Sequence, residues 1–150
     1  MSISEDNTRT DIVVDPESAA LAVEDLHMSY VVRGTPRAVL RGVTFEVRPG
    51  EAYGLVGESG CGKSTTAYAA LRYLPGNGQI DNGRVTADGG VLTDMSASEL
   101  RDFRARHVSM VYQDPVQALN PVLKIGRQVA EAFVVLGQSK DEARASALNA

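Results

Sequence analysis

Residues Gly57-Glu58-Ser59-Gly60-Cys61-Gly62-Lys63-Ser64 form the stretch that decides the fold class. Four residues separate the first glycine from Gly-Lys-Ser, and this spacing is typical of a phosphate-binding loop. Glycines let the backbone turn tightly, so that successive main-chain N–H groups converge on one point and can bind an anion. The pattern predicts a polyphosphate site at the N-terminus of a helix.

The segments on either side of the loop support this interpretation. Residues 52–56 are a short apolar run, which predicts a buried parallel strand, and residues 65–74 have helical apolar spacing that ends at Pro75-Gly76. Strand, loop and helix in this order indicate an α/β fold. The alternative is a glycine-rich turn with an incidental lysine, but such a turn would need neither the second half of the loop nor the Lys-Ser that follows.

Two side chains at the end of the loop have a predicted chemical role. Lys63 would place a full positive charge on the β- and γ-phosphates, and the Ser64 hydroxyl would be an oxygen ligand for Mg²⁺. Cys61 is the only cysteine and fills a position where only the backbone matters. The predicted ATP-binding residues of this segment are Gly57, Glu58, Ser59, Gly60, Cys61, Gly62, Lys63, Ser64 and Thr65.

Composition limits the class of protein. The chain has 150 residues, 43% of them hydrophobic and 23% charged, as expected for about one soluble globular domain. Its net charge of -4 disfavours a generic basic face for nucleic acid. With no apolar run of about 20 residues and no export signal, we expect a cytoplasmic location. A single cysteine excludes a disulfide framework.

The segment before the loop reads as a tail followed by antiparallel strands. Residues 1–20 are polar and acidic and predict a flexible tail without a function. Alternating apolar residues predict strands over 21–26, 28–32 and 39–47, with a turn at Gly34-Thr35-Pro36. After the first helix, Asp81-Asn82-Gly83 predicts a turn between short strands. A further strand is predicted over 108–112.

The second half of the chain is predicted to be mainly helical. Two capping boxes, Ser96 with Glu99 and Ser139 with Glu142, predict helix starts, the first helix running to about residue 106. Between them, apolar residues at helical spacing predict a helix with one apolar face before Gly137. That face comprises Ile125, Val129, Ala132, Phe133 and Leu136.

The loop and a second motif together resemble the nucleotide-binding subunit of ABC transporters. Gln113, in Val111-Tyr112-Gln113-Asp114-Pro115, lies fifty residues after Lys63, where this family has its glutamine loop. Residues 110–115 with Ala118-Leu119-Asn120-Pro121 resemble the oligopeptide and dipeptide importer branch. The resemblance covers residues 21–150. It implies a P-loop NTPase fold with an N-terminal antiparallel β-subdomain and an α-helical subdomain that starts near residue 116.

The resemblance also implies roles for two residues outside the loop. Tyr30 corresponds to the aromatic residue that stacks on adenine, although a tyrosine that only packs across strands remains an alternative. Gln113 corresponds to the residue that reaches Mg²⁺ and the attacking water, and whose loop moves with the membrane partner. Its neutral carboxamide can offer an oxygen to the metal and withdraw again without leaving an unpaired charge.

The function implied is ATP binding and hydrolysis that drive the uptake of peptides or related solutes, with ATP and Mg²⁺ as cofactors. The implied partners are transmembrane permease subunits, a second ATP-binding subunit, identical or related, and indirectly an extracytoplasmic solute-binding protein. The implied location is peripheral, on the inner face of the cell membrane, with no nucleic acid partner. The alternatives are a soluble ABC-type ATPase acting on nucleic acid or the ribosome, and a small-molecule P-loop kinase.

The sequence also departs from the family pattern. It contains no Leu-Ser-Gly-Gly signature and no apolar strand ending in Asp-Glu, and both histidines, His27 and His107, lie before the expected switch histidine. We therefore expect the chain to be truncated before the rest of the catalytic core. Residues 1–150 alone should bind nucleotide at best, because the catalytic base is missing.

Overall fold

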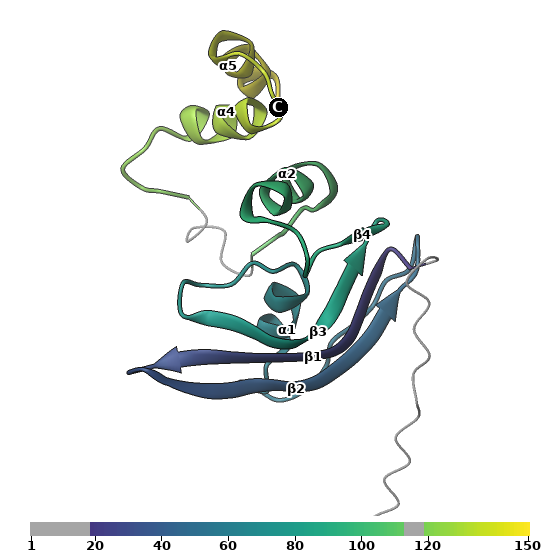
Figure 1. Ribbon diagram of the computed structural model, residues 1–150. Helices are drawn as coiled ribbons and strands as arrows, with labels where there is room; N and C mark the ends of the chain where they lie inside the picture. The colour runs from purple at the N-terminus through teal and green to yellow at the C-terminus, as the bar shows by residue number, and fades with distance from the viewer. Residues whose placement is uncertain (1–18, 113–118) are drawn as a thin grey trace, which may run out of the picture. The chain divides into compact units, whose positions relative to one another are not determined.

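The structure is a computed structural model that describes residues 19–112 and 119–150. The chain divides into two compact units, one ending at Met95 and the other spanning Ser96–Ala150. The first contains the sheet and one helix, and the second contains three described helices (Figure 1). The predicted tail up to residue 18 and the predicted start of a helical subdomain near residue 116 lie outside the described residues.

The described strands of the first unit form one antiparallel sheet in the order β2-β1-β3-β4. Figure 1 shows three long, curved strands beside one another, with a short fourth strand beyond β3. The antiparallel arrangement was predicted, but the two separate strands expected before residue 33 are one continuous strand. The strands are β1 (Leu21–Val32), β2 (Thr35–Val47), β3 (Gly78–Ala87) and β4 (Gly90–Val91).

The β1–β2 connection is a tight two-residue turn. Val32 pairs with Thr35, and the two residues between them, Arg33 and Gly34, have φ angles of 53° and 77°. Two left-handed residues form the turn type whose twist matches that of paired strands. The turn predicted at 34–36 is therefore displaced, and Pro36 lies within β2, an edge strand where a missing N–H is tolerated.

An irregularity at Asp25 brings three strands close together. Asp25 has a φ of 45°, its amide donates to Thr44 Oγ1 at 2.9 Å, and its carboxylate accepts from Asn82 Nδ2 at 3.0 Å. Opposite, Gly83 lies inside β3 and not in a turn as predicted. A Cβ on Gly83 would lie 2.5 Å from the carbonyl oxygen of Asp25. The glycine lets the bulged backbone of β1 approach its neighbour.

Two predicted strands are absent as strands. Residues 52–56 and 108–112 have no strand assignment, and Val56 and Val111 are 94% and 95% exposed. A buried parallel strand exists only through hydrogen bonds to neighbouring strands. No strand of the described residues pairs with either segment. Tyr53, in the first of these segments, stacks on Phe45 with ring centroids 5.2 Å apart.

Helix α1 (Lys63–Ala70) is shorter than predicted because the chain leaves it at Arg72. Arg72 has a φ of 51°, its amide donates to the Ala69 carbonyl, and the Tyr73 amide donates to Tyr68. These two bonds form a Schellman C-terminus, in which glycine usually occupies the left-handed position. Arg72 occupies this position here, and its Nη1 donates to the carbonyls of Leu92 and Met95 at 2.7 and 2.8 Å.

The core of the first unit lies where α1 meets the sheet. Small residues allow close approach of the helix, and larger apolar residues of β1, β2 and β3 fill the space. The buried apolar side chains include Ala22, Val23, Leu26, Met28, Leu40, Phe45, Ala69, Ala70, Val85 and Leu92.

The described helices of the second unit are α2 (Ala97–His107), α4 (Ile125–Val135) and α5 (Lys140–Asn149). Both predicted capping boxes are present, at Ser96 and Ser139. The helix predicted before Gly137 is present as α4, and on its predicted apolar face Ile125 and Leu136 are 64% and 58% exposed, while Ala130 is buried. Within the described part of the chain, none of the helices has the length and apolar character needed to cross a membrane.

The two capping boxes should open in acid. The side-chain hydrogen bond of each serine, and then its backbone amide, hold the pKa values of Glu99 and Glu142 below their ordinary value of 4.5. A carboxyl whose pKa is lowered on folding stabilises above its unfolded pKa, and this contribution is lost as the pH falls through the folded value. We expect the Ser96 and Ser139 amide resonances to shift below pH 4.5 as the boxes open.

The double variant Glu99→Gln/Glu142→Gln is the matched control, because glutamine can complete a capping box without titrating. The two serine amides of this variant should show no such acid transition. If they titrated in parallel with those of the wild-type protein, the carboxylates would not be the cause.

Candidate phosphate-binding site

The predicted phosphate-binding loop connects the sheet to the N-terminus of α1. Gly60 and Gly62 have φ angles of 82° and 98°, in the left-handed region that favours glycine. Gly62 is the N-cap residue of α1, so the free N–H groups of the first helical turn face the end of the loop. No side chain caps this helix start. The arrangement leaves main-chain donors available for an anion.

Lys63 is the first residue of α1, and its ammonium lies over the loop. Nζ donates to the carbonyls of Gly57 at 2.8 Å and Glu58 at 2.6 Å, and lies 3.6 Å from the Cys61 sulfur. The loop thus folds around the one ammonium that the sequence predicts as a phosphate ligand. An incoming polyphosphate would compete with two carbonyl oxygens for these donors, and charge-assisted bonds to phosphate are the stronger ones.

The first helical turn carries three hydroxyl side chains, which differ in how far they are exposed. Ser64, the predicted Mg²⁺ ligand, is exposed, and Thr65 beside it is half-buried. Thr66, which the sequence did not single out, is buried, and its Oγ1 donates to the Gly62 carbonyl at 3.0 Å. This bond fixes the end of the loop to the helix. The residue type hinted at it, because a threonine hydroxyl commonly bonds to a carbonyl four residues earlier.

Tyr30 lies near the end of β1, half-buried, between the two neighbouring strands. Its register partners are Arg37 on β2 and Gly78 on β3. The preceding residue, Ser29, donates to Asp81 Oδ1 at 3.0 Å and so lies on the face of the sheet that carries Asp81. Because side chains alternate along a strand, Tyr30 lies on the opposite face.

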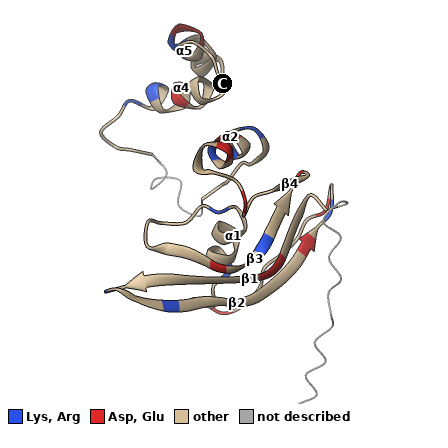
Figure 2. Ribbon diagram, in the orientation of Figure 1, with Lys and Arg blue, Asp and Glu red and all other residues tan. Residues whose placement is uncertain are grey.

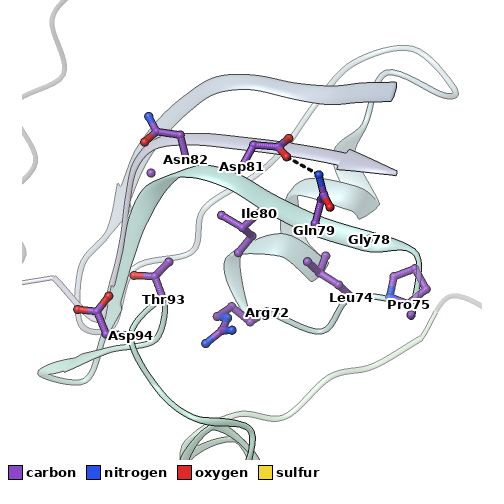
Figure 3. A pocket seen from close by; sticks show the side chains of 12 residues that line it. Arg72, Leu74, Pro75, Gly78, Gln79, Ile80, Asp81, Asn82, Thr93 and Asp94 are labelled. Carbon is purple, nitrogen blue, oxygen red and sulfur yellow. Dashed lines mark hydrogen bonds between the residues drawn. The ribbon is translucent and has the colours of Figure 1, made fainter. Parts of the chain in front are cut away.

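Helix α1 and the turn that follows it lie on this opposite face of the sheet. Figure 3 shows Gln79 and Asp81 on one side of β3 and Leu74 and Ile80 on the other. A Cβ on Gly78 would lie 3.1 Å from Met28 Cε and 3.2 Å from Leu74 Cβ. The side chains of Met28 and, by alternation, Tyr30 therefore share the face on which Leu74 lies.

A residue of β2 links this face to the loop. Leu40, the β2 partner of Met28, has its Cδ2 3.6 Å from where a Cβ of Gly62 would lie. Sequence reasoning missed Leu40, because nothing in its local pattern indicates which segment it meets. The structure thus places the loop end and Tyr30 on one face of the sheet. Gln113 lies outside the described residues.

A cavity among the described residues lies elsewhere. It has a volume of about 530 Å³ and is lined mainly by residues 72–83 with Thr93 and Asp94 (Figure 3). It does not include the phosphate-binding loop. Figure 2 shows basic and acidic residues interspersed along the described strands.

Comparison with known proteins defines the class. The family model described as ABC transporter matches residues 40–150, and the chain belongs to that family. A solved dimeric structure of the ATP-binding cassette MJ0796, in a post-hydrolysis state bound to ADP and Pi, is similar with a TM-score of 0.70 and 23% identity. The match covers 86% of this chain and 54% of that one. The fold is accordingly a fragment of the P-loop NTPase fold, an antiparallel sheet followed by helices.

The names of curated relatives are more specific than the family description. The dipeptide transport ATP-binding protein DppD of Bacillus subtilis is 39% identical over 76% of this chain and 34% of its own length. The oligopeptide transport ATP-binding protein OppD of Salmonella typhimurium is 37% identical over 95% of this chain and 42% of its own length. The chain thus spans well under half the length of these relatives. Both relatives are peptide-transport ATP-binding proteins, which agrees with the oligopeptide and dipeptide importer branch that the sequence resembles.

Proposed function

We propose that the chain forms the nucleotide-binding part of an ABC transporter ATPase that drives the uptake of peptides or related solutes. The observation that carries this proposal is the ammonium of Lys63 held over a glycine loop at the start of α1. Family membership implies ATP binding, typically with Mg²⁺, and the relatives named above are peptide-transport ATP-binding proteins.

The residues present fit a magnesium-bound triphosphate. The loop amides and the free N–H groups of α1 would bind phosphate oxygens, and Lys63 would exchange its two carbonyl partners for the β- and γ-phosphates. Ser64 and Gln113 would hold Mg²⁺, which neutralises charge that develops during phosphoryl transfer. Tyr30 would stack on the adenine.

We assign binding, and not complete hydrolysis, to residues 1–150. Phosphoryl transfer depends on positioning, on charge neutralisation and on a group that aligns the attacking water. The sequence supplies the first two but contains no apolar strand ending in Asp-Glu to provide the third. Turnover by these residues alone should be negligible.

The proposed assembly places the protein on the cytoplasmic face of a membrane. Its partners would be transmembrane permease subunits and a second ATP-binding subunit, with an extracytoplasmic solute-binding protein acting indirectly. No observation favours an ATPase acting on nucleic acid or a small-molecule kinase over this function. The net charge of -4 disfavours a generic basic face for nucleic acid.

Calorimetry with MgATP tests the proposal directly. The folded protein should release or absorb heat on titration with MgATP, and inorganic tripolyphosphate should compete with the nucleotide, because the loop recognises phosphate. A folded protein, verified by circular dichroism, that takes up no MgATP would contradict the proposal.

A substitution at Gln113 separates binding from coupling. In the complete transporter, Gln113→Ala should leave the dissociation constant for MgATP within about threefold and reduce hydrolysis by about 10²-fold or more, since orienting the nucleophile contributes on that scale. Gln117→Ala, which removes the same group four residues later in the sequence, is the control. An equal loss of MgATP binding and hydrolysis in Gln113→Ala would show that the residue serves binding or folding instead.

A further inference from the structure

Arg37 lies directly opposite Tyr30 in the β1–β2 ladder. Cross-strand partners in an antiparallel pair are about 5 Å apart and project their side chains to the same face. Arg37 is exposed and Tyr30 is half-buried. A planar cation therefore accompanies the predicted base-stacking ring on the same face of the sheet.

The other register neighbour of Tyr30 is packed against the turn that follows α1, since a Cβ on Gly78 would lie 3.2 Å from Leu74 Cβ and 3.3 Å from the Pro75 carbonyl oxygen. Gly78, its partner on β3, has no side chain. On the two strands that flank β1, Arg37 is therefore the residue whose side chain lies level with the tyrosine. A flat ligand lying on this ring would meet Leu74 and the Pro75 carbonyl on the β3 side and a guanidinium on the β2 side.

The pair also lies at a suitable position relative to the loop. Leu40, the register partner of Met28, approaches Gly62, and Tyr30 lies two residues beyond Met28. Two residues of strand correspond to about 7 Å. A nucleotide with its phosphates in the loop would thus extend its ribose past Leu40 and bring its base to Tyr30 and Arg37.

We propose that Arg37 contacts the nucleoside end of the bound nucleotide, where its guanidinium donates hydrogen bonds to ring nitrogens of the base and to ribose oxygens. This assignment rests on the proposed nucleotide-binding function. Arginine has five N–H donors and no acceptor. It would therefore recognise acceptor atoms that adenine and guanine share, such as N7, and strengthen purine binding without choosing between the two bases.

The test compares three ligands by calorimetry: MgATP, MgGTP and magnesium tripolyphosphate, which has no nucleoside. Arg37→Ala should weaken MgATP and MgGTP alike by about tenfold, the scale of one charge-assisted hydrogen bond. Its affinity for tripolyphosphate should remain that of the wild-type protein. Arg37→Lys should lose less, because it keeps a donor and the charge but not the planar fork.

Arg41→Ala is the matched control. It removes the same charge from the same strand, but Arg41 follows Leu40 directly and so points to the opposite face of the sheet. This variant should bind all three ligands like the wild-type protein. Equal weakening by Arg37→Ala and Arg41→Ala would overturn the inference, because it would indicate a general charge effect.

Two further outcomes would also count against Arg37 as a nucleoside contact. Unchanged MgATP affinity in Arg37→Ala would overturn it while leaving the phosphate site in place. Failure of the wild-type protein to bind any of the three ligands would overturn the proposed function and this inference with it. Circular dichroism of each variant verifies that the sheet is intact.

Discussion

Lys63→Ala should abolish measurable MgATP binding, with a loss of at least about a hundredfold in affinity. The ammonium of the lysine lies over the loop, where Nζ is 2.8 Å from the Gly57 carbonyl and 2.6 Å from that of Glu58. Removing it deletes charge-assisted bonds to the phosphates, each worth about 1.5–3 kcal/mol, and a factor of ten corresponds to about 1.4 kcal/mol.

The matched control is Lys140→Ala, which removes the same charge from the start of α5 in the other unit. It should bind MgATP like the wild-type protein. Because Lys63 also bridges its own loop, the thermal midpoint of Lys63→Ala should be recorded beside the calorimetry. A folded Lys63→Ala protein that binds MgATP within threefold of the wild-type value would remove the central contact of the proposed site.

Gly83→Ala should destabilise the first unit by roughly 4 kcal/mol or more, enough to unfold a marginally stable domain. The new Cβ would lie 2.5 Å from the Asp25 carbonyl oxygen, 2.6 Å from Leu26 Cα and 2.7 Å from the Glu24 carbonyl oxygen. All three are main-chain atoms, so relief requires separating β1 from β3 along the bulge. The φ of 103° adds backbone strain that a non-glycine residue would bear.

Gly89→Ala distinguishes these two contributions. Gly89 also has a positive φ, 74°, but nothing lies within 4 Å of its would-be Cβ. It should therefore show only the backbone term, about 1–2 kcal/mol. Urea unfolding followed by circular dichroism gives both values. Equal destabilisation of the two variants would mean that the close approach at the Asp25 bulge contributes nothing.

The parts of the fold that the sequence predicted are those determined by nearby residues. The capping boxes at Ser96 and Ser139 and the helix after Gly62 depend on contacts within four residues, and all are present. Residues 52–56 and 108–112 were wrong as strands because a strand is defined by its hydrogen-bonded neighbours, which local pattern does not contain. Gly83 was taken for a turn residue because its role depends on a backbone more than fifty residues earlier.

The residues of the candidate site also divide into those that the local sequence predicted and those that only the structure revealed. Spacing alone indicated Lys63 and the loop glycines, since their geometry is built within one segment. Leu40, which touches the loop end, and Arg37, which faces Tyr30, became visible only through strand register. Register was not predictable here, because bulges interrupt the pairing of β1 with β2 and β3 at several points and each shifts the partners of the residues that follow.

The contacts of Arg72 affect how the first unit unfolds locally. Its backbone closes the C-terminal end of α1, while its guanidinium binds the carbonyls of Leu92 and Met95. One residue thus fastens the helix that starts at the phosphate-binding loop to the segment that ends the unit. Fraying at either place releases the other, so the two form a single cooperative element although some twenty residues of chain separate them.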